Sequence, residues 1–262
     1  MREAIKNYSY KPEPRFKRGK RERKHSDYYG LEWEMELSSS SAFEERELAY
    51  ELMELASEYA YCKSDGSIVD GCELVTEPIT LKAWEETYFD ELKKIEGKMK
   101  EMKCKESCKN AGIHIHFSRE NLDDATIKKI CYLLSKPSNY QYMINFCKRT
   151  REKMQQWAGP YAYSESFANF DPFRKNRYKI VNLNNSNTIE FRCFGYTNKV
   201  EDIRAYIYAV NSIVTFCKDC RNINLLKNVD MQKVLTFGNT EYMTDYLKKR
   251  KMFREEDTQC AL

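Results

Sequence analysis

The sequence lacks any apolar run of about 18 residues or more, and it has no apolar segment of the kind found in signal peptides. Insertion into a membrane and secretion are therefore both disfavoured. Ten cysteines among 262 residues are too sparse for the disulfide framework of a secreted scaffold, so we expect reduced thiols and a cytoplasmic protein. The net charge is only +4, which says little about binding partners.

The composition is that of a globular chain, with 42% apolar and 13% aromatic residues. The length suits one large domain or two small ones, and no internal repeat or boundary divides it. Residues 1–27 are polar and basic, with the strongest charge over residues 15–24. We expect an extended tail there, either solvated or in contact with a polyanion such as nucleic acid.

Residues 112–118 contain two of the three histidines and alternate between apolar and polar side chains. A period of two indicates a strand whose two faces meet different surroundings. The imidazoles would lie about 7 Å apart on one face, where they could share a metal or a polyanion, or simply face solvent. The apolar positions are Ile113, Ile115 and Phe117, and the polar positions are His114, His116 and Ser118.

Residues 29–37 alternate in the same way and place Glu32, Glu34 and Glu36 on one face. Three carboxylates in a row on one strand face repel each other. Exposure to solvent on an edge strand would relieve that repulsion. A divalent cation would also relieve it, because carboxylate oxygens are preferred ligands of Mg²⁺ and Mn²⁺.

The rest of the chain predicts an α+β fold with an antiparallel sheet and helices on one side. A further strand is expected at 72–78, and a hairpin at 177–183 and 188–194 that places Glu190 and Arg192 on one face. Residues 158–176 have no period and indicate a lid or substrate loop. Helices are expected over 41–61, 81–103, 123–135 and 142–157, with helical structure over 199–251. The first helix would bury Phe43, Leu48, Leu52, Leu55 and Ala56.

A zinc site is an alternative use of the histidines, because Cys104 and Cys108 precede them closely and thiolates and imidazoles are the usual zinc ligands. The cysteines end a helix rich in lysine and glutamate, which favours packing instead. Cys217 and Cys220 have no second cysteine pair to complete a tetrahedral site.

Four segments resemble, in order, the motifs of the amidoligase family within the glutamine synthetase/glutamate–cysteine ligase superfamily of carboxylate–amine ligases. The resemblance covers about residues 28–215, and the order of the segments is more specific than any one of them. The segments are 30–34 (GLEWE), 65–67 (DGS) with 73–78 (ELVTEP), 112–118 (GIHIHFS), and 177–182 (RYKIVN) with 188–192 (TIEFR), followed by 195–197 (GYT).

The resemblance implies a curved antiparallel sheet, backed by helices, that forms a funnel for ATP and two or more Mg²⁺ or Mn²⁺ ions. Residues 28–262 would form the catalytic domain, after the basic tail at 1–27. The resemblance also implies two groups of metal ligands. Because Glu36 adds a third carboxylate beside Glu32 and Glu34, it stays open which two of these three glutamates are ligands. The implied ligands are Glu34 and Glu73 for one ion, and Glu32, His114 and Glu190 for another.

The resemblance also implies roles for polar residues around the metals. Arg192 and His116, with Ser118, would contact the ATP phosphates, and Arg192 and Glu190 would be catalytic. Arg177 and Asn182 would bind a substrate carboxylate. Asp65 or Glu77 would accept the proton of the amine, and nothing in the sequence chooses between them.

The implied reaction is ATP-dependent amide formation from a glutamate-like or peptide carboxylate and an amine, through an acyl phosphate. Two alternatives stay open. One is a non-catalytic descendant that keeps the fold and binds a nucleotide or peptide. The other is a protein that associates with nucleic acid through residues 15–24.

Overall fold

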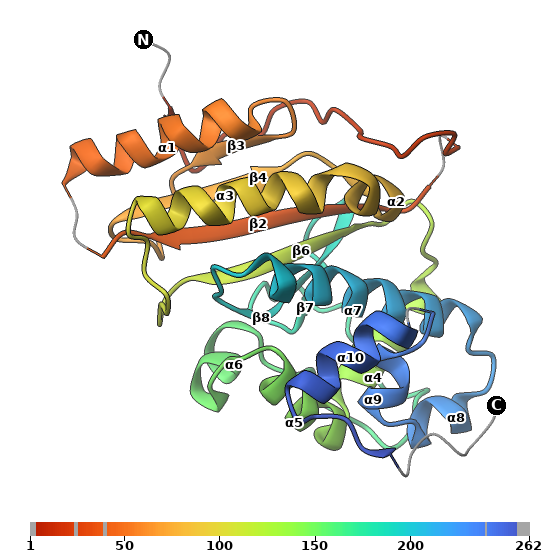
Figure 1. Ribbon diagram of the computed structural model, residues 1–262. Helices are drawn as coiled ribbons and strands as arrows, with labels where there is room; N and C mark the ends of the chain where they lie inside the picture. The colour runs from red at the N-terminus through yellow and green to blue at the C-terminus, as the bar shows by residue number, and fades with distance from the viewer. Residues whose placement is uncertain (1–3, 24–25, 39–40, 239, 256–262) are drawn as a thin grey trace.

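The computed structural model describes residues 4–23, 26–38, 41–238 and 240–255 (Figure 1). In this described part, eight strands form one open sheet in the order β1-β3-β4-β2-β6-β8-β7, with β5 paired to β2. The named strand pairs are antiparallel except β1–β3. The strands are β1 (Ile5–Lys6), β2 (Tyr28–Glu36), β3 (Ala60–Lys63), β4 (Gly71–Thr76), β5 (Ile79–Thr80), β6 (Gly112–Ser118), β7 (Val181–Asn182) and β8 (Thr188–Gly195).

Helices cover the apolar face of this sheet, which confirms the α+β class. In Figure 1, α3 (Phe89–Glu101) lies in front of β2 and β4, and α7 (Val200–Asp219) lies in front of β6 and β8. The apolar sets of the two alternating strands point toward these helices, and Trp33 and Ile115 are fully buried. Burial of each such side chain stabilises the fold by roughly 1.5–3 kcal/mol.

The other helices surround this core. α1 (Ala42–Ala56) packs beside α3, and the short turns α2 (Leu81–Ala83) and η1 (Trp84–Tyr88) lead into α3. Ser41 begins α1 with a capping box to Glu44, which satisfies backbone N–H groups that the helix leaves unpaired. The remaining helices are α4 (Asp124–Ser135), α5 (Pro137–Phe146), α6 (Arg151–Trp157), α8 (Ile223–Asn228), α9 (Met231–Leu235) and α10 (Thr240–Lys249).

Several expected elements have different bounds. The helix expected over 41–61 ends at Ala56, and β3 follows it. The helix expected over 142–157 is two helices, α5 and α6, because Lys148 adopts a positive φ of 54° and Thr150 caps a new helix. The expected strand 177–183 is reduced to β7, and the helical region 199–251 is divided into α7 to α10.

One predicted core residue is wrong. Phe43, expected in the buried stripe of the first helix, is 73% exposed. It lies in the first turn of α1, before the part of the helix that contacts the sheet and α3. Leu48, Leu52 and Ala56 are buried as predicted.

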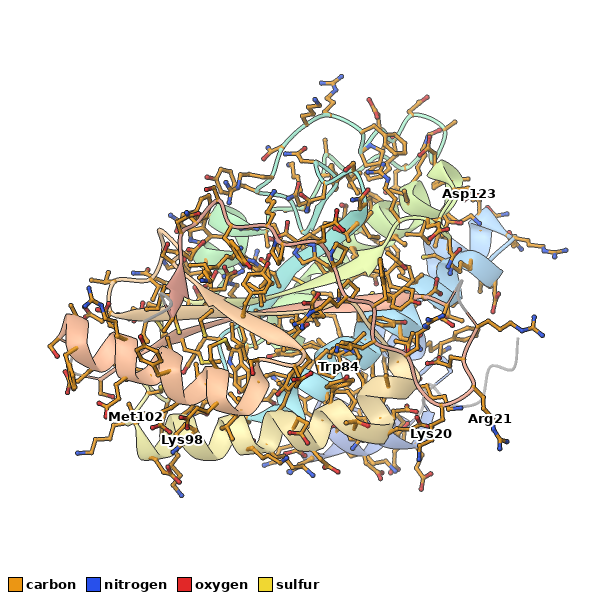
Figure 2. All side chains as sticks on the ribbon, turned by 90° about the horizontal axis from the view of Figure 1, so that it is seen from above. Lys20, Arg21, Trp84, Lys98, Met102 and Asp123 are labelled. Carbon is orange, nitrogen blue, oxygen red and sulfur yellow. The ribbon has the colours of Figure 1, made fainter. Side chains whose placement is uncertain are left out.

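The described N-terminal residues 4–23, here called the N-terminal arm, are extended and pack against the sheet. β1 pairs with β3, and Lys17 exchanges backbone hydrogen bonds with Pro78 and Thr80. Figure 2 shows this chain crossing the side of the sheet opposite α3, with Lys20 and Arg21 at the edge of the molecule. Lys24, at the end of the basic run, lies outside the described residues.

Among the described residues, no helix is long and apolar enough to cross a membrane. The nine cysteines in the same part of the chain are free thiols.

Candidate active site

The face of the sheet opposite the helices carries rows of mostly polar residues. Residues paired between neighbouring strands point to the same face, so the register fixes which side chains meet. The first row is Lys63, Glu73 and Glu34, and the second is Tyr61, Val75, Glu32 and His114. The third row is Gly30, His116, Glu190 and Asn182.

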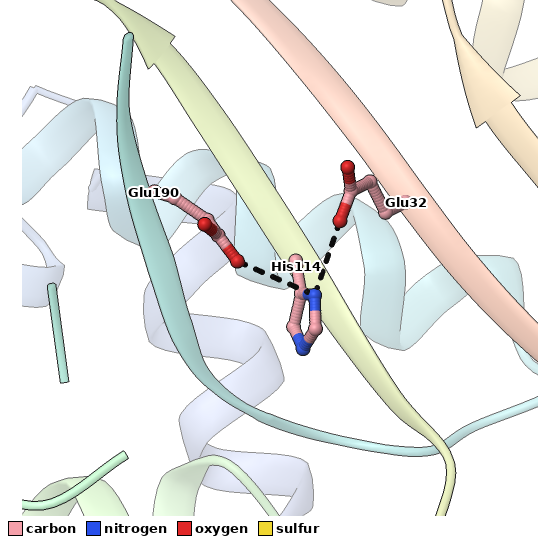
Figure 3. A group of neighbouring side chains, drawn as sticks. All are labelled: Glu32, His114 and Glu190. Carbon is pink, nitrogen blue, oxygen red and sulfur yellow. Dashed lines mark hydrogen bonds and ion pairs between the residues drawn. The ribbon is translucent and has the colours of Figure 1, made fainter. Parts of the chain in front are cut away.

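Glu32, His114 and Glu190 come from β2, β6 and β8 and meet in the middle of this face (Figure 3). His114 Nδ1 lies 3.2 Å from Glu32 Oε2 and 3.5 Å from Glu190 Oε1. Burial alone would raise the pKa of Glu32, but the charge of His116 and hydrogen bonds from both histidines hold that pKa well below its usual range. Glu32 is therefore a carboxylate at neutral pH.

Glu34 and Glu73 form a second acidic pair on the other side of His114. His114 Nε2 lies 4.0 Å from Glu34 Oε1, and the Gly112 backbone N–H donates to Glu34 Oε2. Burial raises the pKa of both carboxyls, and the nearby charge of Glu32 raises that of Glu73 further. Burial thus disfavours the charged form of both carboxyls.

These side chains fit a divalent cation by their chemistry. Two groups, Glu32–His114–Glu190 and Glu34–Glu73–His114, each offer ligand atoms within 4.8 Å of one another. Glu73 Oε2 is buried and has no hydrogen bond of good geometry from any described residue, although Lys63 Nζ lies 3.0 Å away. Carboxylates with one imidazole suit Mg²⁺ or Mn²⁺.

His114 can ligate only one ion at a time, because a neutral imidazole has one free lone pair. Its Nδ1 is closer to Glu32 and Glu190 than its Nε2 is to Glu34. The distances therefore favour His114 as a ligand beside Glu32 and Glu190, which leaves Glu34 and Glu73 as a carboxylate pair. Neither group in the described part of the chain contains a cysteine, so the zinc alternative is not supported.

The hairpin of β7 and β8 holds Glu190 with two hydrogen-bond partners. Asn182 Nδ2 donates to Glu190 Oε2 at 2.7 Å, and Arg192 Nη1 donates to Glu190 Oε1. Burial raises the pKa of Glu190, but the nearby positive charges of His116, His114 and Arg192 have a larger effect, so the pKa lies below its usual value. Opposite His114, β8 carries one extra residue, a bulge of the kind that often redirects side chains beside active sites.

His116 and Ser118 continue along β6 away from this cluster. His116 Nδ1 lies 2.9 Å from Thr188 Oγ1, and its Nε2 lies 3.2 Å from Glu32 Oε1. Burial lowers the pKa of His116, but the charge of Glu32 raises it to a value above the usual one. The Ser118 hydroxyl accepts a hydrogen bond from the Tyr28 backbone N–H.

Other predicted site residues lie at the border of the cluster. Glu36 pairs with Lys105 at 2.9 Å and belongs to neither group of potential ligands. Asp65 is half-buried, accepts hydrogen bonds from Ser67, and raises the pKa of Glu34 by its charge.

Two further predicted residues contact the N-terminal arm. Glu77 is buried, and both its oxygens accept hydrogen bonds from Arg15, from the backbone N–H and from Nε, each at 2.8 Å. Arg177 is exposed, and its guanidinium lies 3.4 Å from the Tyr8 hydroxyl.

Two basic residues at the site were missed from the sequence. Lys63 Nζ lies 3.0 Å from Glu73 and 3.8 Å from Glu32. Arg149 reaches the site from the loop between α5 and α6 and donates to the Arg192 carbonyl at 2.6 Å. The alternation of residues 60–63 could have indicated β3 and Lys63, but no local pattern marks Arg149.

Comparisons with known proteins give the family. A family model described as "Putative amidoligase enzyme" matches residues 18–214. No curated protein matches. Among solved structures, the fold is similar to the crystal structure of the complex between the prokaryotic ubiquitin-like protein Pup and its ligase PafA, with 9% identity and a TM-score of 0.40. That match covers 86% of this chain and 59% of the other, so the chain spans about three fifths of that protein's length. The family match covers most of the sequence, and the chain belongs to the amidoligase family.

Proposed function

We propose that this protein is an ATP-dependent carboxylate–amine ligase. One observation carries the proposal. In a chain of the amidoligase family, five potential metal ligands from four strands converge on one buried face of the sheet. Glu34 and Glu73 would hold one Mg²⁺ or Mn²⁺ ion, and Glu32, His114 and Glu190 would hold another. When bound, these ions neutralise phosphate charge, which is the main requirement of phosphoryl transfer.

The protein's own side chains position the reactants around that cluster. Arg192 and His116 would contact the ATP phosphates, and an arginine so placed contributes roughly 10³–10⁵ in rate in other phosphoryl-transfer enzymes. A substrate carboxylate oxygen attacks the γ-phosphorus and ADP leaves. The amine then attacks the acyl carbon of the acyl phosphate, the amide bond forms and phosphate leaves.

The amine must lose a proton in the second step. Glu77 already accepts two hydrogen bonds from Arg15, whereas Asp65 is half-buried next to Glu34 and, within the described residues, its carboxylate accepts hydrogen bonds from Ser67 alone. We therefore favour Asp65 as the proton acceptor. Arg177 and Asn182 would bind the substrate carboxylate, which we expect to be glutamate-like or part of a peptide.

The experiment is ADP release with Mg²⁺ or Mn²⁺ across a panel of carboxylates and amines. Hydroxylamine serves as one amine because it converts an acyl phosphate to a hydroxamate that can be detected directly. Glu190→Gln should abolish turnover. Glu36→Gln is the matched control, because it removes the same charge from the same sheet face outside both ligand groups. Equal activity of the two variants would contradict the proposal.

The two alternatives give different results. A non-catalytic descendant would bind ATP with metal but release no ADP with any substrate pair. A nucleic-acid-associated protein would bind a polyanion with an affinity that falls steeply with salt and depends on residues 15–24. In that segment Arg15 is already engaged by Glu77. Cytoplasmic location stays a prediction.

A further inference from the structure

A cavity of about 640 Å³ adjoins the acidic cluster on the same face of the sheet. Gly30, Ser118 and His116 lie along its floor, and Glu32 lines the side toward the cluster. Small-molecule sites in proteins measure about 300–1,000 Å³, so the size suits a ligand of that class. Of the proposed metal ligands, Glu32 lines the cavity, so the cavity reaches the edge of the metal cluster.

The N-terminal arm supplies one wall of this cavity through Pro12, Pro14 and Phe16. Arg15 fastens the arm to Glu77 by two hydrogen bonds, and the backbone bonds of Lys17 continue it beside β5. The family match begins only at residue 18, after these wall residues. The wall is therefore contributed by a segment that the family model does not cover.

The wall presents an aromatic surface to the cavity. Phe16 is 55% exposed, and its ring lies 4.9 Å from that of Tyr28 in an edge-to-face arrangement. Both rings line the cavity, together with prolines of the arm. A half-exposed aromatic ring beside a second ring is suited to stack on a flat, partly apolar group. Bases of nucleotides are such groups, and aromatic side chains bind them by stacking.

The direction of β6 connects the cavity to the cluster. Ser118 lies at the cavity and His114 at the cluster, four residues apart, which is about 13 Å at the rise of a strand. His116 lies between them. A ligand with a flat base at one end and several negative charges at the other would span this distance with its charges near His116 and the metals.

We propose that Phe16 of the N-terminal arm stacks on the base of the nucleoside triphosphate, so that the arm completes the nucleotide site within this cavity. This inference rests on the proposed function, because it places the nucleotide beside the same metal cluster. It makes the arm part of the nucleotide site.

The test compares the affinity of the full-length protein for Mg²⁺–ATP and for Mg²⁺–tripolyphosphate, which lacks base and ribose, by isothermal titration calorimetry. Phe16→Ala should weaken ATP binding by roughly 10–100-fold, from the loss of base stacking, and leave tripolyphosphate binding unchanged. The control Phe43→Ala removes an exposed ring of α1, which is not among the cavity-lining residues, and should change neither affinity. Thermal unfolding verifies that each variant is folded.

Two outcomes would overturn the inference by itself. In the first, Phe16→Ala leaves the affinity for ATP unchanged. In the second, it weakens the binding of ATP and of tripolyphosphate equally, which would mean that Phe16 does not contact the base. If neither ligand binds the wild-type protein in the presence of Mg²⁺, the proposed function fails and this inference fails with it.

Discussion

Lys63 lies between two acidic side chains, and its replacement by methionine tests the charge balance of the site. Its ammonium is 3.0 Å from Glu73 and 3.8 Å from Glu32. At an effective dielectric constant of about 20, these pairs attract by roughly 5 and 4 kcal/mol before the cost of desolvation. The pKa of Lys63, lowered by burial, is raised overall by the two carboxylates.

Lys63→Met leaves the buried carboxylates without this cation. Breaking a buried ion pair by removing one partner costs about 3–5 kcal/mol, so the free energy of unfolding should fall by that amount in metal-free buffer. A divalent cation would then replace the lost charge. An ion at a hundredfold excess over its Kd stabilises by about 2.7 kcal/mol, and the gain should be larger in the variant than in the wild type.

The assay is urea unfolding followed by tryptophan fluorescence, with and without Mg²⁺. Lys105→Met is the control, because it breaks a lysine–glutamate pair with Glu36 outside both ligand groups. The difference in stability between Lys105→Met and the wild type should be the same with and without Mg²⁺. The reasoning is refuted if Lys63→Met is as stable as the wild type without metal, or if Mg²⁺ stabilises both variants equally.

Three further predictions concern the site and its supports. Glu34→Gln should weaken Mn²⁺ binding by about tenfold or more in a calorimetric titration, because loss of a ligand should cost at least as much as loss of a group that orients one, whereas Glu36→Gln should leave it unchanged. Burial raises the pKa of Asp202, but hydrogen bonds from Lys148, Thr197 and Tyr246 lower it below the usual value. The stabilisation from Asp202 is therefore present above about pH 4 and is lost as the pH falls through the folded-state pKa. Asp202→Asn should lower the free energy of unfolding by about 1–3 kcal/mol at pH 7, and denaturant titrations should show this difference vanishing at acidic pH. Gly195→Ala should lower the thermal unfolding temperature, since a Cβ there would lie 2.7 Å from the Lys148 carbonyl oxygen, and overpacking of this kind costs about 1–3 kcal/mol. An unchanged unfolding temperature would contradict that contact.

The site residues that could be predicted from the sequence lie on strands in which apolar and polar side chains strictly alternate. In residues 112–118 the apolar set is fully buried and His114 points to the opposite face, because one-sided burial fixes which residues face the core. The same reasoning places Glu32 and Glu34 on the polar face. The alternation of each strand predicted which side chains lie on its polar face. The order of the family motifs predicted that these side chains come together in one site.

The parts that were missed depend on contacts between distant residues. Arg15 and Glu77 are 62 residues apart, and nothing near either one indicates their pairing, so the packing of the N-terminal arm could not be read from its charge. The start of β3 falls at the end of the helix expected over residues 41–61. This segment is short and follows α1 closely, and it forms a strand because it pairs with β4. Arg149 reaches the site from a loop whose position depends on how α5 and α6 pack.

The most direct test of the central claim is the anomalous scattering of Mn²⁺ in crystals grown with a non-hydrolysable ATP analogue. The account predicts one peak among Glu32, His114 and Glu190, a second between Glu34 and Glu73, and the analogue's phosphates beside both. The absence of Mn²⁺ from these carboxylates in the presence of the bound analogue would contradict it.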